Sequence, residues 1–305
     1  MTSLTLFSPS GVIASATPLR RAAKRLGALG FDVKTDAAAL AKYQRFAGDD
    51  DTRLAALHRV ASEAPDIAMA SRGGYGLTRL VDRIDWKLLA RSVEQGTRWV
   101  GHSDMTLLQL GLLAHAGARS WAGPLACYDF GRAPEEHGEK PVEPVDEVTQ
   151  ACFTEAMDGS LEAVGFRTEA GFDGLQARGT LWGGNLCLLA SLLGTRYLPK
   201  IRGGVLFVED VNEHPYRIER SLLQLHQAGV LGAQKAVLLG AFTEFRKSPL
   251  DRGYTLRSAI EHLRSVTKTP ILTGLPFGHV PTKVCLPVGA KVTLLVQGRD
   301  VLIGW

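Results

Sequence analysis

A chain of 305 residues, 45% of them hydrophobic and 22% charged, is long enough for one large or two ordinary globular domains. Its 35 Lys and Arg residues are nearly balanced by 31 Asp and Glu, which leaves a net charge of +4, and no run of five or more basic residues occurs. Binding to nucleic acid or to an anionic membrane is therefore not expected.

The first part of the chain alternates segments typical of strands with segments typical of helices. In the first helix we expect Thr17 as the N-cap and Pro18 as the first helical residue. This alternation predicts an N-terminal doubly wound α/β domain, a parallel sheet with helices on both faces. The predicted strands lie in 3–11, 31–36, 66–71, 97–103 and 120–126, and the predicted helices in 17–30, 49–65, 85–93 and 104–117.

The composition changes between Arg132 and Val148, a segment rich in proline and acidic residues, as linkers are. We expect an N-terminal domain over 1–133, a linker and connecting helix over 134–172, and a C-terminal mixed, β-rich α/β domain over 173–305. In the last part, short strands are predicted within 163–185, apolar strands in 203–210, 235–242, 270–278 and 290–305, and helices in 215–230 and 255–266.

Cysteine and histidine spacing gives no sign of a metal site or a disulfide framework. No Cys-x-x-Cys or His-Glu-x-x-His pair occurs, so we predict no metal and no cofactor. The four cysteines are expected to be free thiols, which suits a reducing compartment. The N-terminal segment lacks a basic region, and Pro9 and Gly11 interrupt its apolar run, so no secretory leader is expected. No apolar stretch approaches the ~18 residues of a membrane span. The expected location is the cytoplasm.

Ser103 lies in Gly-His-Ser-Asp, between a predicted strand and a long predicted helix. A serine on such a corner projects its Oγ from the carboxyl edge of the sheet, where the first N–H groups of the helix face any developing negative charge. The second glycine of Gly-x-Ser-x-Gly is absent and serine is also a common helix cap, so this stretch alone leaves both readings open. We expect His102 to pack beside the site, because adjacent side chains on such a corner point in different directions.

Three other segments place reactive groups at strand ends. In Arg-Gly-Gly-Tyr-Gly, the N–H groups of a glycine turn could donate to an oxyanion and Arg72 could bind a carboxylate, although a plain surface turn stays open. Glu209 and Asp210 end an apolar strand, where they could orient a histidine or cap the helix near Pro215. His279 follows Phe-Gly in a proline-bracketed loop, which makes it a candidate general base.

Seven segments in this order resemble the L,D-carboxypeptidase family of serine peptidases over essentially the whole chain: SPSG, RFAGDDDTRL, SRGGYG, GHSD, GTLWGGNL, VEDVNEHPYRIER and GLPFGH. The resemblance implies a triad in which Ser103 is the nucleophile, His279 the general base and Glu209 the residue that orients it. It also implies oxyanion donors at the backbone N–H groups of Asp104 and Gly74. The serine in the first domain and its partners in the second would put the active site between them.

The family's reaction, which needs no cofactor, is hydrolysis of the amide between the L-centre of a diamino acid and the terminal D-alanine of murein tetrapeptides. The resemblance thus implies murein tetrapeptide as the substrate and, by analogy, a homodimer. For the terminal carboxylate, charge and position make Arg72 our candidate, and we expect Gly73 to contact the substrate as well. Two alternatives stay open: a related immunity-type hydrolase that cleaves toxic peptidyl or aminoacyl nucleotides, and a non-catalytic peptide-binding protein.

Overall fold

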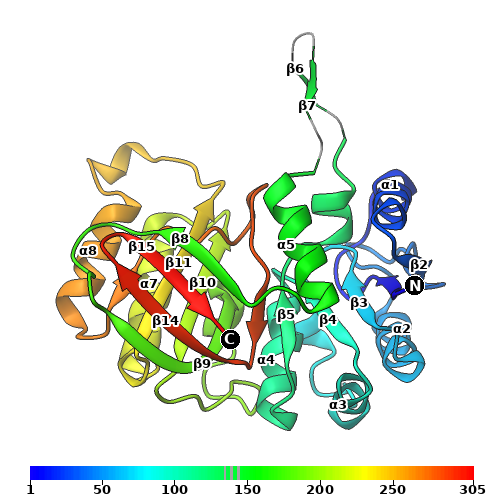
Figure 1. Cartoon of the computed structure of the whole chain (residues 1–305), viewed down its shortest axis with the longest axis horizontal. Coiled ribbons are helices and arrows are strands. Elements are labelled where there is room, and N and C mark those ends of the chain that lie inside the picture. Colours follow the sequence, from blue (N-terminus) through cyan, green and yellow to red (C-terminus); the bar gives the residue numbers. More distant parts are fainter. Residues whose placement is uncertain (134, 138–139, 143–144) are drawn as a thin grey trace.

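The structure is a computed structural model that describes residues 1–133, 135–137, 140–142 and 145–305. In this part of the chain two larger β-sheets lie side by side, each with helices packed on it (Figure 1). Both sheets are built around fully buried apolar strands, and the two hydrophobic layers merge into one continuous core.

The first sheet is parallel except at one edge. Its strands, in spatial order, are β13 (Leu286–Val288), β5 (Ser120–Ala122), β4 (Arg98–Gly101), β3 (Ile67–Ala70), β1 (Ser3–Phe7) and β2 (Asp32–Thr35). β13 pairs antiparallel with β5, and all other neighbours are parallel. The helices of this half are α1 (Ala16–Ala28), α2 (Asp50–Glu63), α3 (Trp86–Glu94) and α4 (Met105–Ala116).

The second sheet is mixed. Its strands, in spatial order, are β12 (Ile271–Leu272), β11 (Ala236–Thr243), β10 (Val205–Val211), β9 (Gln176–Asn185), β14 (Lys291–Gln297), β15 (Asp300–Gly304) and β8 (Ala163–Arg167). The first four are parallel to one another and the last three join antiparallel. β14 alternates exposed and buried residues, as a strand with one solvated face does.

The remaining elements connect or cover the sheets. α5 (Glu147–Asp158) and a short pair of antiparallel strands, β6 (Glu135–His137) and β7 (Lys140–Val142), join the two halves. α6 (Leu186–Ser191), α7 (Pro215–Gln227) and α8 (Leu256–Val266) belong to the second half. Residues 134, 138–139 and 143–144 of the expected linker lie outside the described residues.

The predicted fold class is confirmed: a doubly wound parallel sheet is followed by a mixed, β-rich sheet with helices. Two strands cross the expected domain bounds, because β8 lies in the expected connecting segment yet joins the second sheet, and β13 lies in the C-terminal part yet joins the first. The bounds themselves stay a prediction. One local expectation is wrong: α1 begins at Ala16 with Ser15 at the N-cap, so Thr17 is not the cap and Pro18 is the third helical residue.

α4 connects the two halves. It is apolar on every side, and its residues from Met105 to Leu113 are all buried, which is the pattern of a core helix and not of a surface one. It packs on β4, β5 and β13 of the first sheet and also on β9 and α6 of the second half. The Thr106 side chain of α4 accepts a hydrogen bond from the backbone N–H of Asn185, 2.9 Å away. Any group at the start of α4 therefore lies where the halves meet.

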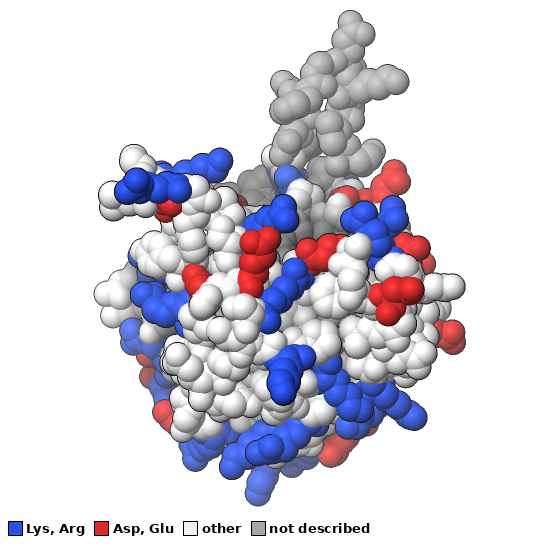
Figure 2. Space-filling model, turned by 90° about the vertical axis from the view of Figure 1, so that its left-hand side faces the viewer, with Lys and Arg blue, Asp and Glu red and all other residues white. Residues whose placement is uncertain are grey.

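The surface carries charges of both signs. Figure 2 shows Lys and Arg gathered along the lower part of one face of the second half, with basic and acidic side chains interspersed above. Among the described residues, none of the helices has the length and apolarity that crossing a membrane requires.

Candidate active site

Ser103 lies on a sharp corner between β4 and α4. Its φ of 63° is in the left-handed region, which residues other than glycine rarely adopt. Asp104 is the N-cap of α4, and neither it nor Ser103 makes a side-chain capping bond there. Among the described residues, no group is hydrogen-bonded to the Ser103 Oγ. The helix-cap reading of this serine therefore has no support in the structure.

The glycine turn after β3 lies directly against Ser103. A Cβ atom on Gly73 would be 2.6 Å from both the Cβ and the Oγ of Ser103 and 3.4 Å from the Asp104 nitrogen, so only glycine fits. The Gly73 carbonyl accepts a bond from the Gly11 N–H at 3.1 Å, and Gly74 has a φ of 106°. The fold thus brings the predicted oxyanion segment and the predicted nucleophile together.

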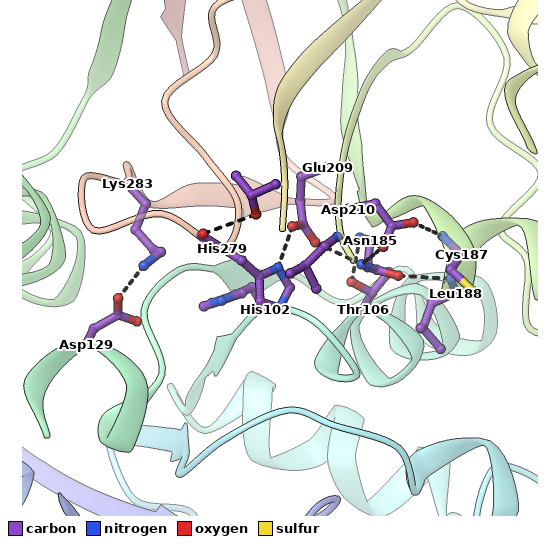
Figure 3. Close-up of polar contacts among 12 residues, drawn as sticks. His102, Thr106, Asp129, Asn185, Cys187, Leu188, Glu209, Asp210, His279 and Lys283 are labelled. Atoms are coloured by element: carbon purple, nitrogen blue, oxygen red, sulfur yellow. Dashed lines mark hydrogen bonds and ion pairs between the residues drawn. The ribbon is translucent and has the colours of Figure 1, made fainter. Parts of the chain in front are cut away.

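His279 and Glu209 are hydrogen-bonded to each other. The distance between His279 Nδ1 and Glu209 Oε2 is 2.7 Å, with the Glu209 side chain fully buried and that of His279 12% exposed (Figure 3). Gly278, before the histidine, has a φ of 133°, and a Cβ there would lie 3.1 Å from Glu209 Oε2. A glycine at 278 is what lets the loop bring His279 onto the carboxylate.

Asn185, which sequence reasoning did not single out, connects Glu209 to Asp210. Its Nδ2 donates to Glu209 Oε1 at 3.2 Å and to Asp210 Oδ1 at 2.9 Å. Asp210 Oδ2 accepts from the Cys187 N–H at the start of α6, so Asp210 acts at that helix and not at α7, where His214 is the N-cap. Burial raises the pKa of Asp210 to about 6, with the neighbouring Glu209 adding to the shift.

His102 is buried against the His279 ring. The two ring centroids are 5.0 Å apart with the planes nearly perpendicular, and His102 Nδ1 lies 2.8 Å from the Gly123 carbonyl oxygen. Its Nε2 is buried and has no hydrogen-bond partner among the described residues. Burial, with the nearby charges of Lys283 and His279, lowers the pKa of His102 well below its usual value. Because Ser103 is the next residue, this contact also brings the serine corner close to His279.

The Asp104 carboxylate is turned away from this cluster. Its Oδ2 accepts from the Ser10 Oγ at 2.6 Å and from the Leu77 N–H at 2.9 Å, and burial raises its pKa. Arg72 is exposed beside the glycine turn, with one guanidinium nitrogen 2.7 Å from the Val12 carbonyl oxygen.

A buried ion pair, also missed from the sequence, flanks the site. Lys283, on the loop after His279, is paired with Asp129, on a helical turn after β5, and both side chains are almost fully buried. The Lys283 ammonium lies 5.1 Å from the centre of the Tyr128 ring, which is itself 6.1 Å from the His279 ring. Figure 3 shows this pair at one end of a row of polar side chains that runs through His279 to Cys187. No short sequence motif signals it, because its members are 154 residues apart.

The described residues contain no group of three or more His, Cys, Asp and Glu side chains that could hold a metal ion. What the arrangement offers chemically is a serine on a strained corner, backbone N–H groups of a glycine turn and a helix start beside it, and a histidine oriented by a buried carboxylate. These are the parts that nucleophilic acyl transfer requires.

Comparison with known proteins identifies the family of this chain. Family models of the LD-carboxypeptidase N-terminal and C-terminal domains match residues 4–123 and 178–294. The probable murein peptide carboxypeptidase of Bacillus subtilis is 31% identical, with 96% of this chain and 90% of that protein covered. The murein tetrapeptide carboxypeptidase of Pseudomonas aeruginosa is 28% identical, with 95% of this chain and 92% of that protein covered.

Solved structures give the same picture. The muramoyltetrapeptide carboxypeptidase from Oxalobacter formigenes superposes with a TM-score of 0.87 at 37% identity, covering 99% of this chain and 98% of that one. The microcin C7 self immunity protein MccF, solved with aspartyl sulfamoyl adenosine, has a TM-score of 0.85 over 100% of this chain and 96% of its own, but at 19% identity it shows the shared fold alone. By its sequence and its structure, this chain belongs to the LD-carboxypeptidase family.

Proposed function

We propose that this protein is a serine L,D-carboxypeptidase that removes the terminal D-alanine from murein tetrapeptides during peptidoglycan recycling. The observation that carries the proposal is the 2.7 Å bond between His279 and buried Glu209, next to a strained Ser103 whose Oγ lies against Gly73. The names of the Bacillus subtilis and Pseudomonas aeruginosa relatives support the choice of substrate. A cytoplasmic location, expected from the sequence, and a homodimer, implied by the family resemblance, belong to the same proposal.

In the proposed mechanism His279 removes the proton of Ser103 as the Oγ attacks the carbonyl carbon before D-alanine. Glu209 accepts the Nδ1–H bond and stabilises the imidazolium. The backbone N–H groups of Asp104 and Gly74 bind the oxyanion of the tetrahedral intermediate. His279 then protonates the leaving amine of D-alanine, and water, activated by the same histidine, hydrolyses the acyl-enzyme. Arg72 is our candidate for the terminal carboxylate of the substrate.

The test is release of D-alanine from purified murein tetrapeptide. Ser103→Ala and Glu209→Gln proteins should lose activity, the serine variant by about 10³-fold or more, as in other triads. Arg72→Ala should instead reduce the preference of the enzyme for a substrate with a free C-terminal carboxylate over one with an amidated C-terminus. Full activity of Ser103→Ala would contradict the mechanism, and intact preference in Arg72→Ala would contradict the role of that arginine.

The same assay separates the two alternatives. An immunity-type hydrolase would cleave aspartyl sulfamoyl adenosine in preference to the tetrapeptide. A non-catalytic binding protein would bind the tetrapeptide without releasing D-alanine.

A further inference from the structure

A pocket of about 800 Å³ opens where β10 and β11 end. Its walls are the N-terminal turns of α7 and the loop over 244–255 that follows β11, at the top left of Figure 1. The side chains that matter below are Asn212, His214, Tyr216, Arg217, Phe245 and Arg246. A volume of this size is far larger than a single D-alanine needs and suits an oligopeptide.

The pocket adjoins the candidate active site. The Asn212 N–H donates to the Thr243 carbonyl at 2.8 Å, and the Thr243 hydroxyl donates to the His279 carbonyl at 3.4 Å. Asn212 also follows the strand that carries Glu209. A ligand bound to the catalytic residues therefore needs to extend only a short way along the same sheet edge to enter the pocket.

The pocket lining carries two arginines, Arg217 and Arg246, and two carboxylates, and Arg217 is already paired with Glu213 at 3.5 Å. Its carboxylates are already engaged, since Asp251 accepts from His214 Nε2 at 3.1 Å and from the Ser248 N–H at 2.7 Å, and Glu219 accepts from the Tyr254 hydroxyl. Arg246 is exposed and makes no hydrogen bond or ion pair with any described residue. A free guanidinium at a pocket wall is suited to bidentate binding of a carboxylate.

Aromatic side chains line the same pocket. The His214 ring is 4.7 Å from that of Tyr216 and 6.0 Å from that of Phe245, measured between centroids, and Tyr216 is 48% exposed. A half-exposed tyrosine and a free arginine that line one pocket fit a ligand that combines an aliphatic chain with an acid group.

We infer that this pocket binds the part of the substrate that precedes the scissile bond, and that Arg246 binds a carboxylate of that part. The inference rests on the proposed function. A murein tetrapeptide has a suitable group there, because its D-glutamyl residue is joined through the side chain and keeps its α-carboxylate free. Arg246 would then favour stem peptides over short dipeptides that end in D-alanine.

The test compares two substrates, murein tetrapeptide and Nα-acetyl-L-lysyl-D-alanine, which lacks the glutamyl carboxylate. We expect Arg246→Ala to lower kcat/KM for the tetrapeptide about 10- to 100-fold, the range of a charge-assisted hydrogen bond, through a higher KM. Its activity on the dipeptide should be unchanged. The matched control is Lys247→Ala, which removes a cation from the same loop that does not line the pocket.

A third substrate identifies the group that Arg246 binds. Amidation of the D-glutamyl α-carboxylate should lower the kcat/KM of the wild-type enzyme as much as Arg246→Ala does. The two changes together should lower kcat/KM no further than either change alone. The inference would be overturned if Arg246→Ala and Lys247→Ala lowered kcat/KM for the tetrapeptide equally, or if Arg246→Ala lowered kcat/KM for the dipeptide.

Binding of the intact tetrapeptide to the Ser103→Ala protein separates the pocket from the chemistry. If Arg246→Ala in that background weakens binding, the pocket is supported even where wild-type protein releases no D-alanine. If wild-type protein releases D-alanine and Arg246→Ala changes neither KM nor binding, the pocket assignment is wrong and the proposed function stands.

Discussion

The corner at Ser103 concentrates strain on one residue. A left-handed φ costs a residue with a Cβ about 1–2 kcal/mol, and the fold keeps a serine there although glycine would be more stable. The neighbouring Gly73 has the opposite constraint, since any Cβ on it would meet the Ser103 Oγ. As long as residue 103 carries a side chain, residue 73 has to be a glycine, so the serine at 103 specifies the glycine at 73.

His102 predicts a pH dependence of stability. Its pKa lies well below the usual value of 6.5 in the folded protein, so below about pH 6.5 the unfolded chain takes up a proton that the folded one does not. Stability should therefore fall as the pH falls, by at most about 1.4 kcal/mol per pH unit until the folded pKa is reached. His279 and Lys283 are the charged or titratable groups that act on this ring.

The measurement is urea unfolding of the wild-type protein and of His102→Asn, whose amide can still donate to the Gly123 carbonyl. Between pH 7.5 and pH 5 the wild-type protein should lose about 2 kcal/mol more than the variant does. Parallel losses in the two proteins would show that His102 titrates normally in the folded state.

At the scale of elements, the loop that carries His279 is fixed at its far end by Lys283. The buried pair with Asp129 attaches this loop to the helical turn after β5, across the boundary between the halves. Removing one partner leaves the other charged and buried, which typically costs about 3–5 kcal/mol. Lys283→Met and Asp129→Leu should each lower the free energy of unfolding by about 3–5 kcal/mol. Both should also slow D-alanine release, because the His279 loop loses its attachment.

The double variant Lys283→Met/Asp129→Leu should be less destabilised than either single one, since it leaves no unpaired charge. An exposed pair on α8, Arg257 and Glu261, is the control, and Arg257→Ala should change stability by no more than about 0.5 kcal/mol. If Lys283→Met were as mild as Arg257→Ala, the pair would not fix the loop. Urea unfolding measures all of these free energies.

Hydrophobic periodicity and turn residues were enough to predict most helices and strands, and element order was enough for the fold class. β13 was not predicted, because it is only three residues long and contains Pro287. Proline is tolerated in this strand because β13 lies at the edge of the sheet. The same limit applies to the site. Ser103, Glu209 and His279 belong to segments that resemble a known family, whereas Asn185 and the pair of Lys283 with Asp129 depend on contacts between distant segments that no local pattern records.

For the whole molecule, two connections make the halves one unit. α4 is buried against both sheets, and β13 returns from the second half to complete the first sheet before the chain runs on into β14. The candidate site lies across this junction, with Ser103 after β4 of the first sheet, Glu209 on β10 of the second and His279 on the loop between β12 and β13. The proposed catalytic geometry needs the two halves to stay docked, because a small shift between them would separate Ser103 from His279.

These connections predict that the halves unfold together. In native-state hydrogen exchange, the most protected amides of β3 and of β10 should report the same free energy of unfolding. Leu286→Ala in β13, a fully buried position, should lower both values equally, by about 2–4 kcal/mol, because the cavity it creates weakens a core shared by the two sheets. If the variant lowered protection in β3 and left β10 unchanged, the sheets would be separate folding units. The site would then depend on docking of two independent domains instead of on one continuous core.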